Sequence, residues 1–288
     1  MNRSDSKHQP WLRTAGMGAV AAAGALTLLA GCQTTPPPTT SPEAVGEVRA
    51  GSGYLNGYLP RDQQPNSLAL LPPPPAAGSE AAAADLARHR ATRALRDSPR
   101  WQQARTDVNL KFPAAAGVFA CSLGINITAE RTPHLNMLLR RSLVDTGQAT
   151  YTAKDHYKRQ RPFAALGEST CEPKEEAALA KDGSYPSGHA ALGWGWALIL
   201  AELAPERAQA IFERGHAFGD SRVVCGVHWQ SDVDQGRTVG AAAVARLHGH
   251  ATFLAQMAEA RREIAEARAR NDVPAAAACT AEAAALKR

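Results

Sequence analysis

The sequence predicts an all-α fold, a single helical bundle, on the strength of three observations. Hydrophobic residues make up 44% of the 288 residues, enough for a core, while aromatic residues make up only 6%. Alanine, the strongest helix former, recurs throughout, and the long apolar runs lack the alternation that strands show. Strand and helix signals do not alternate, and no internal repeat is found, so a parallel sheet is not expected.

Caps and periodicity place the helices in order. The pairs Ser98-Pro99 and Thr132-Pro133 each resemble an N-cap followed by proline at the first helical position, where proline is favoured. The apolar pattern after the second pair stops at Gly147. By the same periodicity, and because proline ends a helix, further helices are expected over 149–161, 172–181, 189–203, 205–218, 231–249 and 251–270.

The first 31 residues predict a removable export signal rather than part of the fold. Three basic residues precede an apolar run (15–30) that is too short for a membrane span. The run ends in LAGC, which resembles the lipobox of bacterial lipoproteins and implies cleavage before Cys32 and a lipid on its thiol. The residue after the cysteine is Gln33 rather than Asp, which in such lipoproteins favours a lipid anchor in the outer membrane, with the protein in the periplasm. The alternative is an ordinary secretory signal with a chance cysteine, giving a soluble periplasmic protein.

A tether and one domain are expected after the signal. Residues 32–51 contain the Pro/Thr-rich run TTPPPTTSPE, typical of an extended linker that holds a domain away from a membrane. Residues 52–288 are expected to form a single helical domain. An even number of cysteines remains there, which in an exported chain predicts two disulfides with three possible pairings. They are Cys121, Cys171, Cys225 and Cys279.

The charge and the cysteine spacing weigh against two classes of partner. The net charge is +5, and it falls to +3 once residues 1–31 are removed. No Lys/Arg-rich block is interleaved with aromatic residues, so binding to a nucleic acid polymer is not expected. No Cys or His spacing fits a zinc site, so a metal is not expected either.

Three clusters of polar residues could carry chemistry. Lys154 and Arg161 are seven residues apart, close to two helical turns, so both cations could project from one side of a helix. Alone, this pattern is common on solvated helix faces. In YPSGH, Ser187 and Gly188 precede His189 at the mouth of an apolar helix. A capping serine, a glycine and successive N–H groups at a helix mouth favour an anion, although for this segment alone a capped helix with a packed histidine is the favoured interpretation.

The third cluster lies in SRVVCGVHWQSD, where Arg222 precedes His228 by six residues and Asp232 follows it by four. If Ser231 caps the next helix, Asp232 lies in the first turn, where a carboxylate is favoured. From there Asp232 can accept a proton from one nitrogen of His228 and leave the other nitrogen as a nucleophile.

Together the three clusters describe a phosphate pocket. Three cations can neutralise the oxygens of a phosphoryl group, and phosphoryl transfer needs mainly positioning and charge stabilisation. A His/His/Asp set could instead bind zinc, but three nearby cations would repel a metal ion.

Three motifs occur in a fixed order along the chain: Lys-x6-Arg-Pro (154–162), Pro-Ser-Gly-His (186–189) and Ser-Arg-x5-His-x3-Asp (221–232). This order and spacing resemble the three-part signature of the superfamily of phosphatidic-acid-phosphatase-like and vanadium-haloperoxidase-like proteins. Longer stretches of sequence also resemble the bacterial class A non-specific acid phosphatases, over roughly residues 52–270. Examples are KRQRPF, GSYPSGHAALGW and RTPHLNMLL. The fold implied is the helical bundle of that family, with the pocket at helix ends. A homo-oligomer and phosphomonoester substrates are implied too, with no cofactor.

The resemblance implies a role for each matched residue. His228 is the nucleophile that forms a phosphohistidine, Asp232 orients it, and His189 protonates the leaving oxygen and then acts as base toward water. Residues implied to bind the phosphate are Lys154, Arg161, Ser187, Gly188 and Arg222. Histidines that match no motif position, and are expected to be structural or exposed, are His89, His134, His156, His216, His248 and His250.

Other activities fit the same pocket. Vanadate mimics phosphate, so a vanadate-dependent haloperoxidase is one alternative. A lipid phosphate phosphatase is another, although integral members carry several membrane spans that this sequence lacks. A non-enzymatic envelope lipoprotein with a degenerate pocket is a third. Phosphotransfer to alcohols is possible, and the physiological substrate stays open.

Overall fold

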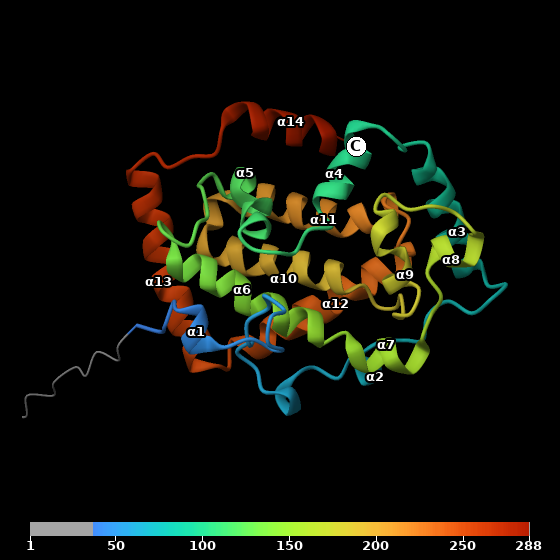
Figure 1. Cartoon of the computed structure of the whole chain (residues 1–288), viewed down its shortest axis with the longest axis horizontal. Helices are drawn as coiled ribbons and strands as arrows, with labels where there is room; N and C mark the ends of the chain where they lie inside the picture. The colour runs from blue at the N-terminus through green and yellow to red at the C-terminus, as the bar shows by residue number, and fades with distance from the viewer. Residues whose placement is uncertain (1–36, 288) are drawn as a thin grey trace, which may run out of the picture. The chain divides into compact units, whose positions relative to one another are not determined.

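The apolar helix α10 (Gly188–Leu203) lies along the middle of the fold. In the computed structural model, which describes residues 37–287, it packs against α6 (Pro133–Gln148), α11 (Ala208–Val224) and α12 (Gln230–Leu247) (Figure 1). A helix that is apolar all round is stable only when neighbours cover it on every side. The expected export signal and Cys32 lie outside the described residues.

The remaining helices cover this centre. Among residues 37–287 there is no strand, and the one β-bridge joins Glu47 to Leu55, so the all-α prediction is confirmed. No helix in this range is both long and apolar enough to cross a membrane. The longer covering helices are α3 (Glu80–Arg93), α4 (Pro99–Thr106), α13 (Ala251–Ala269) and α14 (Ala276–Leu286). The short ones are α1 (Pro42–Val45), α2 (Ser67–Leu70), α5 (Ala120–Leu123), α7 (Tyr151–Tyr157), α8 (Pro162–Leu166) and α9 (Glu176–Leu179), with 3₁₀ turns at Arg61–Gln63, Ala114–Phe119, Pro173–Glu175 and Pro205–Arg207.

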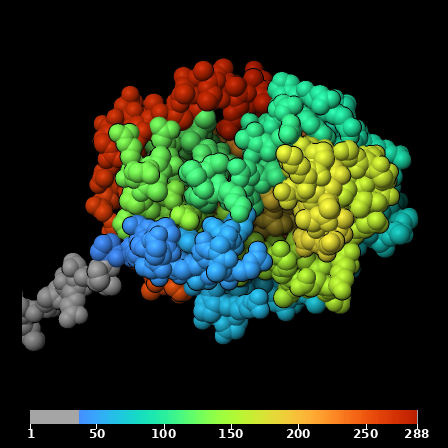
Figure 2. All heavy atoms as spheres, viewed as in Figure 1, coloured from blue at the N-terminus to red at the C-terminus, as the bar shows by residue number. Residues whose placement is uncertain are grey.

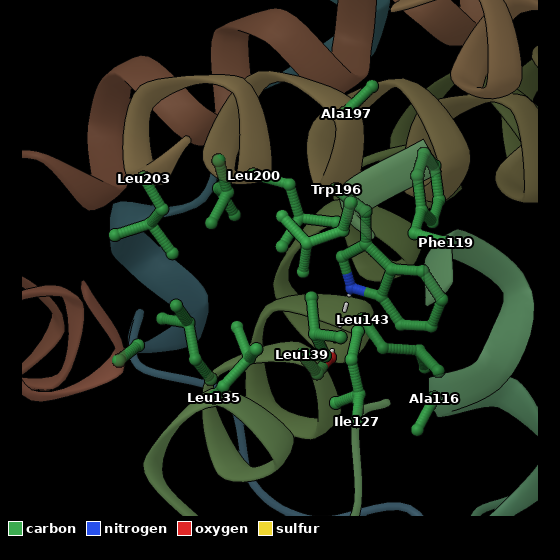
Figure 3. Close-up of a cluster of buried hydrophobic side chains, with 14 of the residues drawn as sticks. Ala116, Phe119, Ile127, Leu135, Leu139, Leu143, Trp196, Ala197, Leu200 and Leu203 are labelled. Atoms are coloured by element: carbon green, nitrogen blue, oxygen red, sulfur yellow. Dashed lines mark hydrogen bonds between the residues drawn. The ribbon is translucent and has the colours of Figure 1, made fainter. Parts of the chain in front are cut away.

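Trp196 is the largest side chain in the core between α10 and α6. It is fully buried, and its indole N–H donates to the carbonyl of Leu139 at 3.1 Å, so the one polar atom of the ring is satisfied. Phe119 meets the ring edge-on, and leucines of both helices, including Leu200, surround it (Figure 3). This packing prevents α10 from sliding along α6, so it also sets the position of the N-terminus of α10.

Two glycines let α12 approach the start of α10 closely. A Cβ at Gly236 would overlap the carbonyl oxygen of Ser187, and a Cβ at Gly240 would overlap that of Ala191. Small residues four apart on a helix permit this kind of backbone contact. The contact brings the first turn of α12, which carries Asp232, beside the mouth of α10.

Most of the predicted helices are present, but two differ from the prediction: the one expected over 172–181 is only the four-residue α9 after a 3₁₀ turn, and the one expected over 149–161 is too long. Helices begin after Ser98 and Thr132, each with proline at its first position, as predicted. The helix expected over 149–161 ends at Tyr157, because Lys158 adopts a left-handed backbone with φ of 44°. Pro162 does not end that helix; it begins the next one, α8. The helix over 276–286 was not predicted, and the one expected over 205–218 extends to Val224.

The fold includes residues before position 52, the expected start of the domain. Ser41 caps α1 through a bond from the N–H of Ala44 to its Oγ, at 3.1 Å. The N–H of Asn56 donates to the carbonyl of Gly46 at 2.9 Å. Residues 42–51 are therefore part of the fold rather than of a tether, because α1 is capped and hydrogen bonds join this segment to residues 54–56.

Asp145 of α6 holds the N-terminal segment in place. Its buried carboxylate accepts from the backbone N–H groups of Tyr58 and Leu59, both at 2.9 Å. A Cβ at Gly57 would overlap the same carboxylate, so the close approach requires glycine. Burial raises the pKa of Asp145 to about 6.

The structure resolves the cysteine pairing. Cys121 bonds to Cys279, which links α5 to α14, and Cys171 bonds to Cys225. The two predicted disulfides are thus present among the described residues. The second holds the chain between Arg222 and His228, two of the predicted site residues.

Candidate active site

A cavity of about 1130 Å³ opens between the N-terminal segment and a group of helix ends. Figure 2 shows the hollow between the blue N-terminal segment and the yellow segment that carries α9. Ser187 and Asp232 are fully buried beside the cavity. The other predicted site residues all line it: Lys154, Arg161, Gly188, His189, Arg222 and His228.

The mouth of α10 faces this cavity. Ser187 is the N-cap, its side chain accepting from the N–H of Ala190 at 3.3 Å, and Gly188 is the first helical residue. A Cβ at Gly188 would meet Thr150 at 3.7 Å, an ordinary contact, so the protein's own packing does not demand glycine there. The absent side chain leaves backbone N–H groups open to a ligand at the positive end of a 16-residue helix.

His228 has a defined tautomer. Arg161 Nη1 lies 3.0 Å from Nε2, and because arginine only donates, Nε2 must carry the lone pair. The proton is then on Nδ1, which faces Asp232 Oδ2 at 3.3 Å. Burial and the neighbouring cations, Arg161 first, hold the pKa of His228 well below its ordinary value. The ring is therefore neutral, with a nucleophilic nitrogen on the cavity side.

Asp232 lies in the first turn of α12, as predicted, but Ser231 is not the cap. The helix begins at Gln230, and the carboxylate of Asp232 itself accepts from the N–H of Trp229 at 2.8 Å. Ser184 Oγ donates to the same carboxylate at 2.5 Å. The carboxylate therefore caps its own helix and orients His228 at once.

Lys154 and Arg161 reach the cavity from two different helices rather than from one side of a single helix. Lys154 lies on α7, and Arg161 is the N-cap residue of α8, after the turn at Lys158. The two cations converge on Asp182 Oδ2, at 3.6 Å from Lys154 Nζ and 3.0 Å from Arg161 Nη2. Burial, and then Arg161, lower the pKa of Lys154 to about 8.

Arg222 is buried in the cavity wall without a full set of partners. Its side chain sits in the last turn of α11 and the residue is 2% exposed. Within residues 37–287, its Nε and Nη1 have no hydrogen-bond acceptor. Burial, and then Arg161, lower its pKa to about 9. A buried cation with unused donors beside two further cations points to an anionic ligand.

His189 lies in the first turn of α10, near the phosphate-binding candidates. Its Nε2 is 3.1 Å from the carbonyl of Val108, which can only accept, so this nitrogen carries a proton. The ring stacks on Phe218 with centroids 6.1 Å apart. Nδ1 is the nitrogen left for a substrate. Burial, and then Arg222, hold the pKa of His189 well below its ordinary value.

Several residues of the site have no sequence motif that would reveal them. Asp182 pairs with Lys154 and Arg161, and Ser184 donates to Asp232, although both lie in the stretch that precedes the helix mouth. Arg159 pairs with Asp232 from two residues before Arg161. Their partners are distant in sequence, so only tertiary contacts identify them. His156, the unmatched histidine nearest in sequence, packs on Tyr157 and does not line the cavity.

Comparison with known proteins gives a consistent result. Residues 134–254 match the PAP2 superfamily. A non-specific acid phosphatase of Providencia stuartii is 42% identical over 210 residues, covering 73% of this chain and 85% of the relative. A non-specific acid phosphatase of Salmonella typhimurium is 43% identical over 204 residues, covering 70% and 82%.

An acid phosphatase of Zymomonas mobilis is 41% identical over 184 residues, covering 64% of this chain and 70% of the relative. Together with the three motifs around one cavity, these likenesses identify the family. The chain belongs to the non-specific acid phosphatases of the PAP2 superfamily.

Proposed function

We propose that the protein is a broad-specificity acid phosphatase that hydrolyses phosphate monoesters through a phosphohistidine on His228. The observation that carries this proposal is the nucleophilic Nε2 of His228 beside three buried cations, Lys154, Arg161 and Arg222, in one cavity. The cations match the charge of the phosphoryl oxygens, and the mouth of α10 adds N–H donors. They supply the charge stabilisation that metal ions supply in other phosphatases.

In the first half-reaction, Nε2 of His228 attacks phosphorus and the bond from phosphorus to the ester oxygen breaks. The ring gains positive charge, which Asp232 stabilises through Nδ1–H. His189 gives a proton to the leaving oxygen. Because its Nε2–H is held by Val108, that proton comes from Nδ1 of the doubly protonated ring.

In the second half-reaction, water attacks phosphorus, the nitrogen–phosphorus bond breaks, and Nδ1 of His189 takes the proton of the water. Free His228 and inorganic phosphate result. An alcohol in place of water would yield a new phosphate ester, so phosphotransfer belongs to the same proposal. The cavity of about 1130 Å³ extends well beyond the space of one phosphate and leaves room for such an acceptor.

Hydrolysis is expected to be fastest in acid. The pKa of His189 is held well below its ordinary value, first by burial and then by Arg222, so its doubly protonated form exists only at low pH. Bound phosphate offsets the repulsion from Arg222 and favours that form. The acid is therefore present below this pKa and lost as the pH rises through it.

Activity toward p-nitrophenyl phosphate in the presence of EDTA tests the proposal. Acid quenching during turnover should trap radioactive phosphate on the wild-type protein and not on His228→Ala. His156→Ala is the matched control, since His156 does not line the cavity, and it should turn over normally. Wild-type turnover by His228→Ala would contradict the mechanism.

We extend the proposal to location, as a periplasmic protein anchored to the outer membrane through a lipid on Cys32. The basic start, the apolar run and LAGC support it, and two disulfides are typical of an oxidising compartment. Labelled palmitate should be incorporated by the wild type and not by Cys32→Ser. Unlabelled wild type in the soluble periplasmic fraction would contradict the anchor. A homo-oligomer is the expected assembly, which sedimentation of the mature protein tests.

A further inference from the structure

The His228–Asp232 pair lies between two arginines of one short loop. Arg161 reaches Nε2 of His228 from the cavity side. Arg159, two residues earlier, donates a hydrogen bond to Asp232 and does not line the cavity. The chemistry proposed above uses Arg161 and leaves Arg159 without a role.

Asp232 uses its two carboxylate oxygens differently. Oδ2 accepts from Ser184 and from the N–H of Trp229, and it faces Nδ1 of His228. Oδ1 accepts from Arg159 Nη1 at 2.7 Å, its one hydrogen bond within residues 37–287. Asp232 is fully buried, so Arg159 supplies the permanent positive charge that a carboxylate away from water requires.

The guanidinium of Arg159 is itself held in one orientation. Nη2 donates to Asp85 Oδ2 at 2.8 Å, and Nη1 also donates to Ser231 Oγ at 2.7 Å. Asp85, on α3, accepts in turn from the N–H and the hydroxyl of Ser231 at 2.9 and 2.5 Å. Arg159 also lies over the ring of Trp229, 5.5 Å from its centroid. A group fixed at this many points can fix the carboxylate that it contacts.

We propose that Arg159 is a positioning residue for phosphoryl transfer: it fixes Asp232, and through Asp232 the tautomer and direction of His228. The inference rests on the proposed phosphohistidine chemistry, in which Asp232 must face Nδ1–H while the ring carries positive charge. With Arg159 removed, Oδ1 loses its partner and the carboxylate can turn away from His228. Phosphate binding is left intact, because Arg159 does not line the cavity.

Arg159→Ala tests the proposal through kinetics and chemical rescue. We expect kcat to fall by about 10- to 100-fold, by analogy with the loss when a partner that orients a metal-binding side chain is removed. KM and the inhibition constant of phosphate should stay within about threefold of the wild type, since substrate contacts are kept. Dilute guanidinium should restore part of kcat by occupying the vacated space, a response that general destabilisation does not give.

Arg237→Ala is the matched control. The side chain of Arg237 is 11% exposed, against 14% for Arg159, and it also pairs with two carboxylates, Asp220 and Asp234. It lies on α12, the helix of Asp232, but contacts neither Asp232 nor the cavity. We expect wild-type kcat and no response to guanidinium.

Arg159→Lys keeps the charge and loses the planar fork, so kcat should be intermediate between wild type and Arg159→Ala. If the alanine variant does not fold, the lysine variant decides: a lower kcat at constant KM supports the proposal, and wild-type kcat overturns it. Wild-type kcat in folded Arg159→Ala, or a loss that falls on KM instead, also overturns it. If the wild type shows no His228-dependent hydrolysis, the proposed function fails rather than this inference.

Discussion

At the scale of single residues, Arg222 carries a buried charge that we propose a phosphate group neutralises. It is 2% exposed, and its Nε and Nη1 have no acceptor among residues 37–287. Each buried, unsatisfied donor costs about 1–3 kcal/mol, more when it carries charge. The lowered pKa of Arg222, about 9, reflects the same burial.

Arg222→Met should therefore be more stable than the wild type and nearly inactive. Replacing a buried charge by an apolar side chain of similar length is expected to raise the free energy of unfolding by about 1–3 kcal/mol. Catalytic efficiency should fall at least about 100-fold, as when one stabilising donor of a transition state is lost. Urea unfolding in phosphate-free buffer and turnover of p-nitrophenyl phosphate measure the two effects. A variant less stable than wild type would show that Arg222 is satisfied without a ligand.

His189→Ala should separate alkyl from aryl substrates. An alkoxide needs a proton to leave, whereas p-nitrophenolate does not, so the loss of the proton donor should cost alkyl phosphates about 100- to 10,000-fold. For p-nitrophenyl phosphate the loss in kcat should be clearly smaller. Parallel assays on glycerol phosphate and p-nitrophenyl phosphate give the ratio. Equal losses on both substrates would assign His189 to binding instead.

At the scale of secondary-structure elements, the second disulfide ties the functional loop to the rest of the chain. Cys225 lies midway between Arg222 and His228, and the N–H of Cys171 donates to the carbonyl of Cys225 at 3.0 Å. The disulfide spans 54 residues of sequence. It therefore restrains the unfolded chain, and in the folded protein it restrains the distance between Arg222, which we propose binds phosphate, and His228, the proposed nucleophile.

Replacing Cys171 and Cys225 by serine should lower the free energy of unfolding by about 2–5 kcal/mol. The kcat of the remaining folded protein should fall as well, because the loop between Arg222 and His228 loosens. The Cys121→Ser/Cys279→Ser pair is the control: it should lose stability by a similar amount and keep its kcat at a temperature where it is folded. Thermal melts and assays below the melting range test both. Unchanged kcat in the first pair would limit that disulfide to a structural role.

The elements also show what the sequence could predict. The motifs at 186–189 and 221–232 lie at helix ends, which caps, glycine and proline mark locally, although the cap predicted at Ser231 is wrong. Lys154 and Arg161 both line the cavity, but the prediction that they project from one side of a single helix is wrong, because a left-handed Lys158 separates their helices. Asp182 and Arg159 were missed, because their partners come from elements distant in sequence and no local pattern encodes them.

At the scale of the whole molecule, the fold brings three positively charged side chains to one cavity. Lys154, Arg161 and Arg222 come from three helix ends, and their mutual repulsion contributes to the lowered pKa values of Lys154 and Arg222. An anion that binds there relieves the repulsion in the folded state and has no equivalent site in the unfolded chain.

Inorganic phosphate should therefore raise the melting temperature of the whole protein, in a manner that depends on its concentration. At about 100 times its dissociation constant the stabilisation should be about 2.7 kcal/mol. Sodium chloride at the same ionic strength is the comparison for general salt effects, since sulfate would resemble phosphate at a helix N-terminus. Arg222→Met should lose most of the shift, as scanning calorimetry would show. The same shift in that variant would place the anion elsewhere.

The N-terminal wall of the cavity suggests how new substrates could be acquired. Nine residues between positions 48 and 66 line the cavity, and this segment lies outside 134–254, the stretch that matches the superfamily and holds every proposed catalytic residue. Asp145 binds that segment through backbone N–H groups, which any amino acid except proline presents. The contact constrains the sequence only at position 57, where a Cβ would overlap the carboxylate. The segment between positions 48 and 66 could therefore change in sequence without disturbing the proposed catalytic residues. Substrate selectivity could then diverge between relatives while the reaction stays the same.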